Sequence, residues 1–245
     1  MPKKEIEGQR GTMREVSMNE ISALDILSNP GHLILQKVAA LEDDETVYLL
    51  MPAIEGCQGW GTISLEEIGT VRTLFRQLVK GMQHMHSKGI CHARMCLENV
   101  LFDESRQNAY IINFGWSFLM PVDDEHRRLK SVPDGRRAEA SYCSPEIFKG
   151  EAYDGVKVDV FAAGAILFRM LAGRPPFETA SGFDKDFKRL VCEGEVAEAI
   201  GRHQLELIPD GEEAVKLLRG MMAPAPEDRL SLDQVLEHPW MAHGV

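Results

Sequence analysis

The chain of 245 residues contains no apolar run long enough to cross a bilayer, and no hydrophobic segment follows the lysines near its first residue. The sequence therefore predicts neither a membrane-spanning nor a secreted protein. Its five cysteines are an odd number without a C-x-x-C pair. This argues against a disulfide framework and favours reduced thiols in a cytoplasmic or nuclear compartment.

Positive charge is also scarce. The chain has 27 Lys and Arg against 38 Asp and Glu, a net charge of −11, which argues against nucleic acid or an anionic membrane as the main partner. Apolar residues make up 44% of the sequence and charged residues 27%, a globular composition rather than a disordered one. The length allows one large domain or two small lobes.

The first third of the chain has a mixed α/β pattern. Residues 13–27 place apolar side chains at helical spacing, and Pro30 with Gly31 ends the pattern. Two apolar runs, 33–41 and 46–51, are separated by an acidic turn, which predicts a β-hairpin. Pro52 and the glycines that follow mark the best candidate for a lobe boundary.

The remainder is expected to be mainly helical. Apolar residues recur every three or four positions over 65–86, which predicts an amphipathic helix. The expected helix at 158–171 is apolar almost all round, which predicts that it is buried on every side. The expected elements are the amphipathic helix up to about residue 89, strands at 100–102 and 110–112, a basic loop over 116–143, the buried helix 158–171 and short helices over 186–237.

Short motifs stand at the joints between these elements, in a particular order. They are His92-Ala93-Arg94 with Asn99, Asn113-Phe114-Gly115, Ser144-Pro145-Glu146, Asp159 to Gly164, Pro226-Glu227-Asp228-Arg229 and His238-Pro239-Trp240. From about residue 4 to 241, this order resembles a protein kinase domain of the calcium/calmodulin-dependent and Snf1-like group.

The resemblance implies a two-lobed α+β fold within one kinase-like domain. A reduced antiparallel-sheet N-lobe of about three strands and one helix would occupy residues 1–52. A hinge would follow at 53–57, and a mainly helical C-lobe at 58–245.

The N-terminal part departs from the family pattern. Lys4 matches the strand lysine and Glu20 the helix glutamate, but no G-x-G-x-x-G loop precedes Lys4. Lys4, Glu20 and Asn99 are therefore expected to form only a vestigial nucleotide site, with no cofactor and with Mg-ATP binding weak or absent. The edge of the expected strand at 3–7 is predicted to be an interaction surface.

The positions that the family uses for catalysis and metal binding are also changed. Arg94 stands at the catalytic aspartate's position and has no acceptor for a proton, Cys96 replaces a lysine, and Asn113 replaces a metal-binding aspartate. Ala93 stands where the family has an arginine that pairs with a phosphorylated activation loop. These changes predict an inactive homologue with no catalytic residue and no metal site.

The function that follows is a non-catalytic scaffold or allosteric regulator whose partner is a protein, either an active kinase or a second copy. The alternative is a residual or atypical ATP-dependent serine/threonine transferase. The resemblance also implies four structural residues: His92, Glu146, Asp159 and Arg229.

Two further features of the sequence have an ordinary structural interpretation beside a functional one. Histidines and cysteines between residues 84 and 96 lack the spacing of a zinc site, so core roles are favoured. The basic residues of the 127–137 stretch form either a solvated loop or a docking patch for an acidic partner; they are Arg127, Arg128, Lys130, Arg136 and Arg137.

Overall fold

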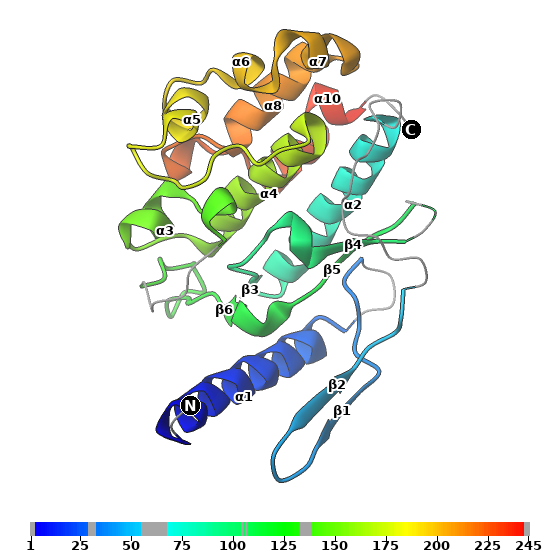
Figure 1. Ribbon diagram of the computed structural model, residues 1–245, viewed down its shortest axis with the longest axis vertical. Helices are drawn as coiled ribbons and strands as arrows, with labels where there is room; N and C mark the ends of the chain where they lie inside the picture. Colours follow the sequence, from blue (N-terminus) through cyan, green and yellow to red (C-terminus); the bar gives the residue numbers. More distant parts are fainter. Residues whose placement is uncertain are drawn as a thin grey trace.

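The computed structural model describes residues 3–28, 33–54, 68–103, 105, 107–132 and 139–242, with side chains described except those of 3–14 and 68. An N-terminal helix and a β-hairpin lie on one side of the molecule, and the helical remainder lies on the other (Figure 1). Short strands between these two parts carry the loops described below.

Helix α1 spans Lys3–Ile26 and confirms the helix expected at 13–27. The expected strand at 3–7 is wrong, because these residues form the first turns of α1. Four of residues 3–7 are Lys or Glu, which have high helix propensity, and this local preference prevails over the strand implied by the resemblance. Lys4 therefore stands on a helix, and the proposed strand edge does not exist.

The predicted hairpin is confirmed. Strands β1 (Ala39–Glu42) and β2 (Val47–Leu50) pair antiparallel, with Ala39 opposite Leu50. Asp43 fixes the acidic turn because its Oδ1 accepts bonds from the backbone N–H groups of Glu45 and Thr46, at 2.9 and 2.7 Å.

The expectation of about three strands in this part is not met among the described residues, where the hairpin stands alone as a two-stranded sheet. Residues 33–35 do not extend the hairpin. Instead, Leu35 N–H donates to Ile111 O at 3.1 Å, and Ile111 N–H donates to Leu33 O at 3.0 Å. These bonds tie the N-terminal part to the centre of the molecule.

The amphipathic helix is α2 (Ile68–Ser87), and it ends just before Gly89, whose φ of +74° is left-handed. Strand β3 (Ile90–Cys91) pairs with β6 (Phe118–Leu119), and β4 (Val100–Phe102) pairs with β5 (Ala109–Ile111). The predicted strand at 100–102 is matched, and the second lies one residue earlier than expected. The two short sheets hold the 92–99 loop and the 113–117 segment beside each other.

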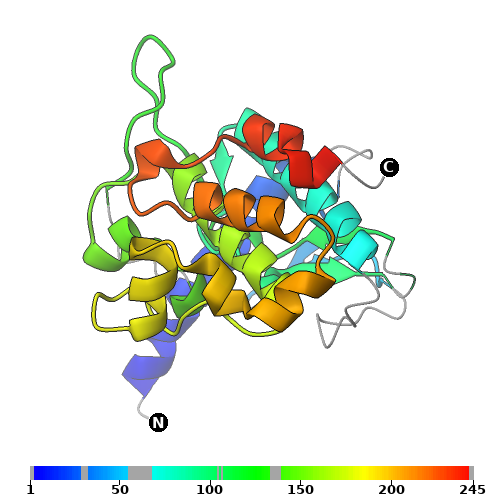
Figure 2. The same cartoon turned by 90° about the horizontal axis from the view of Figure 1, so that it is seen from above.

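Helix α4 (Gly155–Ala172) is buried along nearly its whole length, as its apolar sequence predicted. The Asp154 side chain caps its first turn by accepting from Val156 N–H. Helix α8 (Gly211–Met221), orange in Figure 2, packs against α4, whereas α9 (Leu232–Glu237), drawn in red, packs against α2. The other helices are α3 (Pro145–Lys149), α5 (Lys185–Phe187), α6 (Val196–Ile200), α7 (Arg202–Leu207), α8 (Gly211–Met221), α9 (Leu232–Glu237) and α10 (Pro239–Ala242).

The architecture is thus α+β, with small antiparallel sheets and a mainly helical larger part. Residues 55–57 of the expected hinge lie outside the described residues, so the division into lobes at that point stays a prediction. Among the helices of the described ranges, none is both long and apolar enough to span a membrane.

Candidate functional site

Asp159 organises the loop that follows β3. It projects from α4 and is 1% exposed. Its Oδ2 accepts from His92 N–H and from His86 Nε2, both at 2.9 Å, and its Oδ1 accepts from Ala93 N–H at 3.0 Å. A buried carboxylate with three donors fixes the backbone of the loop relative to the helical core.

His92 is fully buried beneath the loop and packs against Phe114, with ring centroids 4.9 Å apart. Burial lowers the pKa of His92, so the ring is neutral. Its Nε2–H donates to Ile112 O at 3.0 Å, and its Nδ1 accepts from Arg94 N–H at 3.3 Å. His92 thus joins the 92–99 loop to the 113–117 segment.

Asn99 and Asn113 meet across these two segments. Asn113 Nδ2 donates to Asn99 Oδ1 at 3.0 Å, and Asn99 Nδ2 donates to Arg94 O at 2.8 Å. Asn113 has a left-handed backbone with φ of 66°, which asparagine tolerates better than most residues.

The fold family implies a divalent cation at this position, and the residues present do not fit one. The two side chains that meet here are neutral amides, whereas Mg²⁺ favours carboxylate and phosphate oxygens. Within the described ranges, no group of three or more His, Cys, Asp or Glu side chains is placed to hold a metal ion. The histidines and cysteines between residues 84 and 96 form no such group either.

Helix α1 contributes two residues to the same region. Glu20 Oε1 accepts from Phe114 N–H at 3.1 Å, and Asn19 Nδ2 donates to Gly115 O at 2.9 Å and to Ser117 O at 2.6 Å. Burial raises the pKa of Glu20, while the backbone hydrogen bonds at Phe114 and Asn113 oppose this shift. The Lys4 side chain lies outside the described residues, so its expected ion pair with Glu20 is not seen.

Arg94 contacts the paired amides through its backbone carbonyl, which accepts from Asn99 Nδ2, and its side chain is 35% exposed. Its guanidinium lies 3.8 Å from the Glu139 carboxylate and 5.7 Å from the centre of the Trp116 ring. Sequence reasoning missed Asn19, Trp116 and Glu139. Asn19 is next to Glu20, and Trp116 directly follows the Asn113-Phe114-Gly115 motif, so their positions in the sequence were a signal. No feature of the sequence points to Glu139.

Cys96, which stands where the resemblance has a lysine, lies in the interior of the protein. The residue is 4% exposed and belongs to the hydrophobic core. Burial raises the pKa of its thiol to about 11, and the nearby Glu98 carboxylate adds to this. A neutral, buried thiol contributes no charge to the site.

Glu146 and Arg229 form a buried bidentate ion pair, at 2.6 and 2.8 Å. The remaining guanidinium donors reach the carbonyl oxygens of Ala223, Lys157 and Pro224. All five donors of Arg229 are therefore satisfied, and helix α3, which carries Glu146, is fixed to the segment between α8 and α9.

The basic stretch is partly neutralised by local acids. Arg127 bonds to Asp123 at 2.7 Å and to Glu125 at 2.8 Å, while Arg128 lies 3.7 Å from Asp154. Arg136 and Arg137 lie outside the described residues. The described part fits a solvated loop, and a docking patch stays a prediction.

Comparison with known proteins agrees with this arrangement. The model of the protein kinase domain family matches residues 2–241. CBL-interacting serine/threonine-protein kinase 15 of Arabidopsis thaliana is 29% identical over 239 residues, which cover 95% of this chain and 52% of that protein. CBL-interacting protein kinase 25 of Oryza sativa subsp. japonica is 28% identical over 240 residues, 94% of this chain and 43% of that protein. The chain thus spans about half the length of these relatives.

These matches correct one prediction. The chain was expected to be no enzyme, but the family model that spans it is that of the protein kinase domain, and its relatives are named as protein kinases. The relatives also support the Snf1-like part of the predicted resemblance. The chain belongs to the protein kinase superfamily.

Proposed function

We propose that this domain is an atypical serine/threonine kinase that slowly transfers the γ-phosphoryl group of ATP to a hydroxyl group, with ADP as the leaving group and the hydroxyl proton released to water. The observation that carries the proposal is the position of Arg94. The Arg94 backbone carbonyl binds Asn99, which pairs with Asn113, and the partly exposed Arg94 guanidinium lies near Glu139 and over Trp116, in a loop fixed by Asp159. The family match and the names of the relatives support the reaction class.

The missing carboxylate lowers the rate without removing every contribution to it. Arg94 has five donors and no acceptor, so it cannot take the proton of the attacking hydroxyl. Loss of general-base assistance costs roughly 10²–10⁴-fold in rate. Phosphoryl transfer depends mainly on positioning and on stabilising the charge of the transferred group, and these contributions do not require a base.

Arg94 supplies positive charge instead. Guanidinium groups bind phosphate oxygens through paired hydrogen bonds, and such charge-assisted bonds are strong. The ion pair that holds Arg94 is long, at 3.8 Å, and the Glu139 side chain is 50% exposed. Exposed pairs of this kind contribute about 0–1 kcal/mol, so Arg94 can exchange Glu139 for a phosphate at little cost.

Helix α1 completes the support of the site. Glu20 and Asn19 hold the backbone from Phe114 to Ser117, which places Asn113 against Asn99. Because these amides are neutral, we expect the nucleotide to bind weakly, and the charge of Arg94 to account for much of the affinity.

The proposal is tested by incubating the purified chain with MgATP and a library of serine- and threonine-containing peptides, and by mapping phosphate by mass spectrometry. We expect slow phosphorylation of hydroxyl groups that is lost in Arg94→Ala. The matched control is Arg127→Ala, an exposed arginine that is also paired with carboxylates. Phosphorylation that is absent, or that is equal in both variants, would overturn the proposal.

A further inference from the structure

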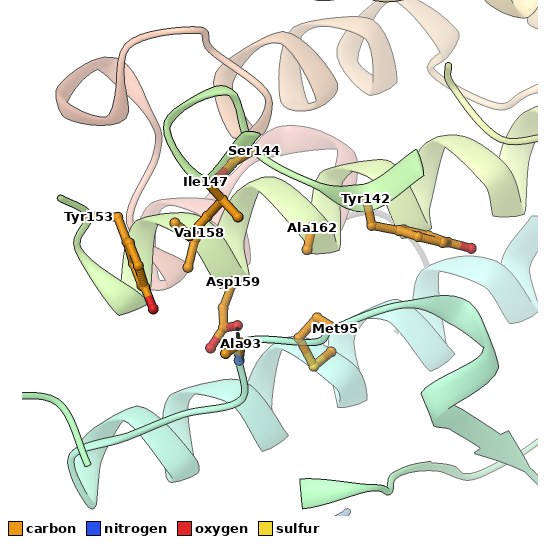
Figure 3. A pocket seen from close by; sticks show the side chains of 9 residues that line it. All are labelled: Ala93, Met95, Tyr142, Ser144, Ile147, Tyr153, Val158, Asp159 and Ala162. Carbon is orange, nitrogen blue, oxygen red and sulfur yellow. Dashed lines mark hydrogen bonds between the residues drawn. The ribbon is translucent and has the colours of Figure 1, made fainter. Parts of the chain in front are cut away.

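The pocket between the 92–99 loop, helix α4 and the segment at 142–147 is too small for an organic ligand (Figure 3). Its volume of about 20 Å³ has room for about one water molecule. Asp159 lines this pocket, and its carboxylate already accepts three hydrogen bonds. The surface of the β1–β2 hairpin offers more room for a partner.

This hairpin presents one open apolar face. In an antiparallel pair, residues that lie opposite each other share a face, and the face alternates along each strand. Leu41 lies opposite Tyr48. Two positions further along, Ala39 lies opposite Leu50, so these residues share one face. The side chains of Leu41, Tyr48 and Leu50 are 56%, 48% and 42% exposed. None of them takes part in the proposed phosphoryl transfer.

The other face of the hairpin is covered by the molecule itself. Val47 and Leu49 alternate with the exposed residues of β2 and are only half-buried or better. Leu49 packs against the hydrophobic core, and β2 contacts helix α1, as Figure 1 shows. A sheet buries an apolar face against another layer, and here only one of the two faces has such a layer.

The turn of the hairpin adds negative charge at one end of the open face. Residues 42–45 are Glu, Asp, Asp and Glu, and all four are exposed. No Lys or Arg occurs over residues 38–50. Hydrogen bonds from the Glu45 N–H and the Tyr48 hydroxyl lower the pKa of Asp43, so its carboxylate stays charged. An apolar face with an anionic end complements a partner that carries both apolar and basic side chains.

A helix covers such a face better than a strand does. A strand that adds to an edge of the hairpin pairs with backbone groups and leaves the side chains of Leu41, Tyr48 and Leu50 uncovered. A helix laid across the face buries them beneath an apolar stripe of residues spaced three and four apart. Basic residues beside that stripe can reach the acidic turn.

We propose that the open face of Leu41, Tyr48 and Leu50 binds a basic amphipathic helix of a partner protein. The apolar stripe of the helix lies on these three side chains, and its Lys or Arg residues lie beside residues 42–45. The apolar contact supplies most of the affinity, while the charges orient the helix and speed its association.

The test is titration of a fluorescent peptide with the full chain, followed by anisotropy and circular dichroism. The peptide contains equal numbers of Leu and Lys over about 18 residues, with the leucines on one helical stripe. We expect saturable binding and a gain of helix. A peptide of the same composition with Leu and Lys in strict alternation, which favours a strand, should bind about tenfold more weakly. Equal or tighter binding of the alternating peptide, or no binding of the helical one, would overturn the proposal.

Variants of the face locate the binding. Leu41→Ser and Leu50→Ser should each weaken binding of the helical peptide about fivefold or more, because an apolar contact is lost. The matched control is Leu207→Ser on helix α7, since Leu207 is also a leucine, is 45% exposed and lies outside the hairpin. All three side chains are exposed, so the melting temperatures should stay close to that of the wild type. Unchanged binding in both hairpin variants, or an equal loss in Leu207→Ser, would contradict the proposal.

Variants of the turn separate local charge from the net charge of the chain. Asp44→Asn combined with Glu45→Gln should weaken binding about fivefold at low salt and less at high salt, because salt screens exposed charges. Asp124→Asn combined with Glu125→Gln removes the same charge from another exposed turn and should have a smaller effect. An equal loss in both double variants would assign the attraction to the net charge of −11 and overturn the placement of the helix beside the hairpin turn.

Discussion

The guanidinium of Arg94 lies 3.8 Å from the carboxylate of Glu139, and it also lies over the ring of Trp116. Glu139 precedes the 3₁₀ turn Ala140–Tyr142, which leads to the segment fixed by the Glu146–Arg229 ion pair. A carboxylate that contacts Arg94 competes with any phosphate that Arg94 could bind. The position of Glu139 therefore sets how readily Arg94 is available.

Glu139→Gln should raise the affinity for ATP up to about fivefold, because an exposed ion pair of up to about 1 kcal/mol no longer competes with the phosphates. Isothermal titration calorimetry with ATP measures the change. Glu125→Gln is the control, since Glu125 is an exposed glutamate paired with Arg127. An equal gain in both variants would show a general effect of net charge rather than release of Arg94.

Asp159→Ala should lower the free energy of unfolding by about 3 kcal/mol or more, because the N–H groups of His92 and Ala93 and the ring of His86 lose their acceptor. Urea denaturation gives this value. The exposed turn residue Asp124, changed to alanine, serves as the control and should have little effect. If the two variants unfold alike, Asp159 does not hold the loop in solution.

Glu20→Gln should change the pH dependence of stability. The pKa of Glu20 is raised in the folded state, mainly by burial, so the folded protein binds this proton more tightly than the unfolded chain does. Stability associated with Glu20 is therefore present below the ordinary glutamate pKa and is lost as the pH rises through the folded-state pKa.

The Gln variant keeps an acceptor for Phe114 N–H but does not titrate. Its melting temperature should fall less than that of the wild type as the pH rises from the ordinary glutamate pKa through the raised value. Glu15→Gln, an exposed change on the same helix, should leave the wild-type slope intact. A Gln variant with the wild-type slope would show that Glu20 titrates normally.

Periodic patterns and local turn chemistry predicted much of the fold. The spacing of apolar residues located α2 and α4, and the acidic turn at Asp43 located the hairpin. The resemblance failed where it imposed a strand on residues 3–7, since helix propensity is a local property that an alignment of motifs does not weigh.

The site was harder to predict because its contacts join distant parts of the chain. The resemblance has a lysine at position 96, but only packing shows that the Cys96 side chain is buried. Trp116 and Glu139 approach Arg94 through folding, and no spacing in the sequence indicates this. The exposure of Leu41, Tyr48 and Leu50 is likewise visible only when the surrounding residues are placed.

The most direct test of the proposed phosphoryl transfer is a single-turnover assay with radiolabelled ATP that compares the wild type with Arg94→Lys and Arg94→Ala. If Arg94 supplies the charge, the rate should fall in the order wild type, lysine, alanine, with alanine lower by about tenfold or more, since lysine keeps the charge but not the paired hydrogen bonds. Equal rates for the wild type and Arg94→Ala, or no transfer by the wild type, would contradict the account.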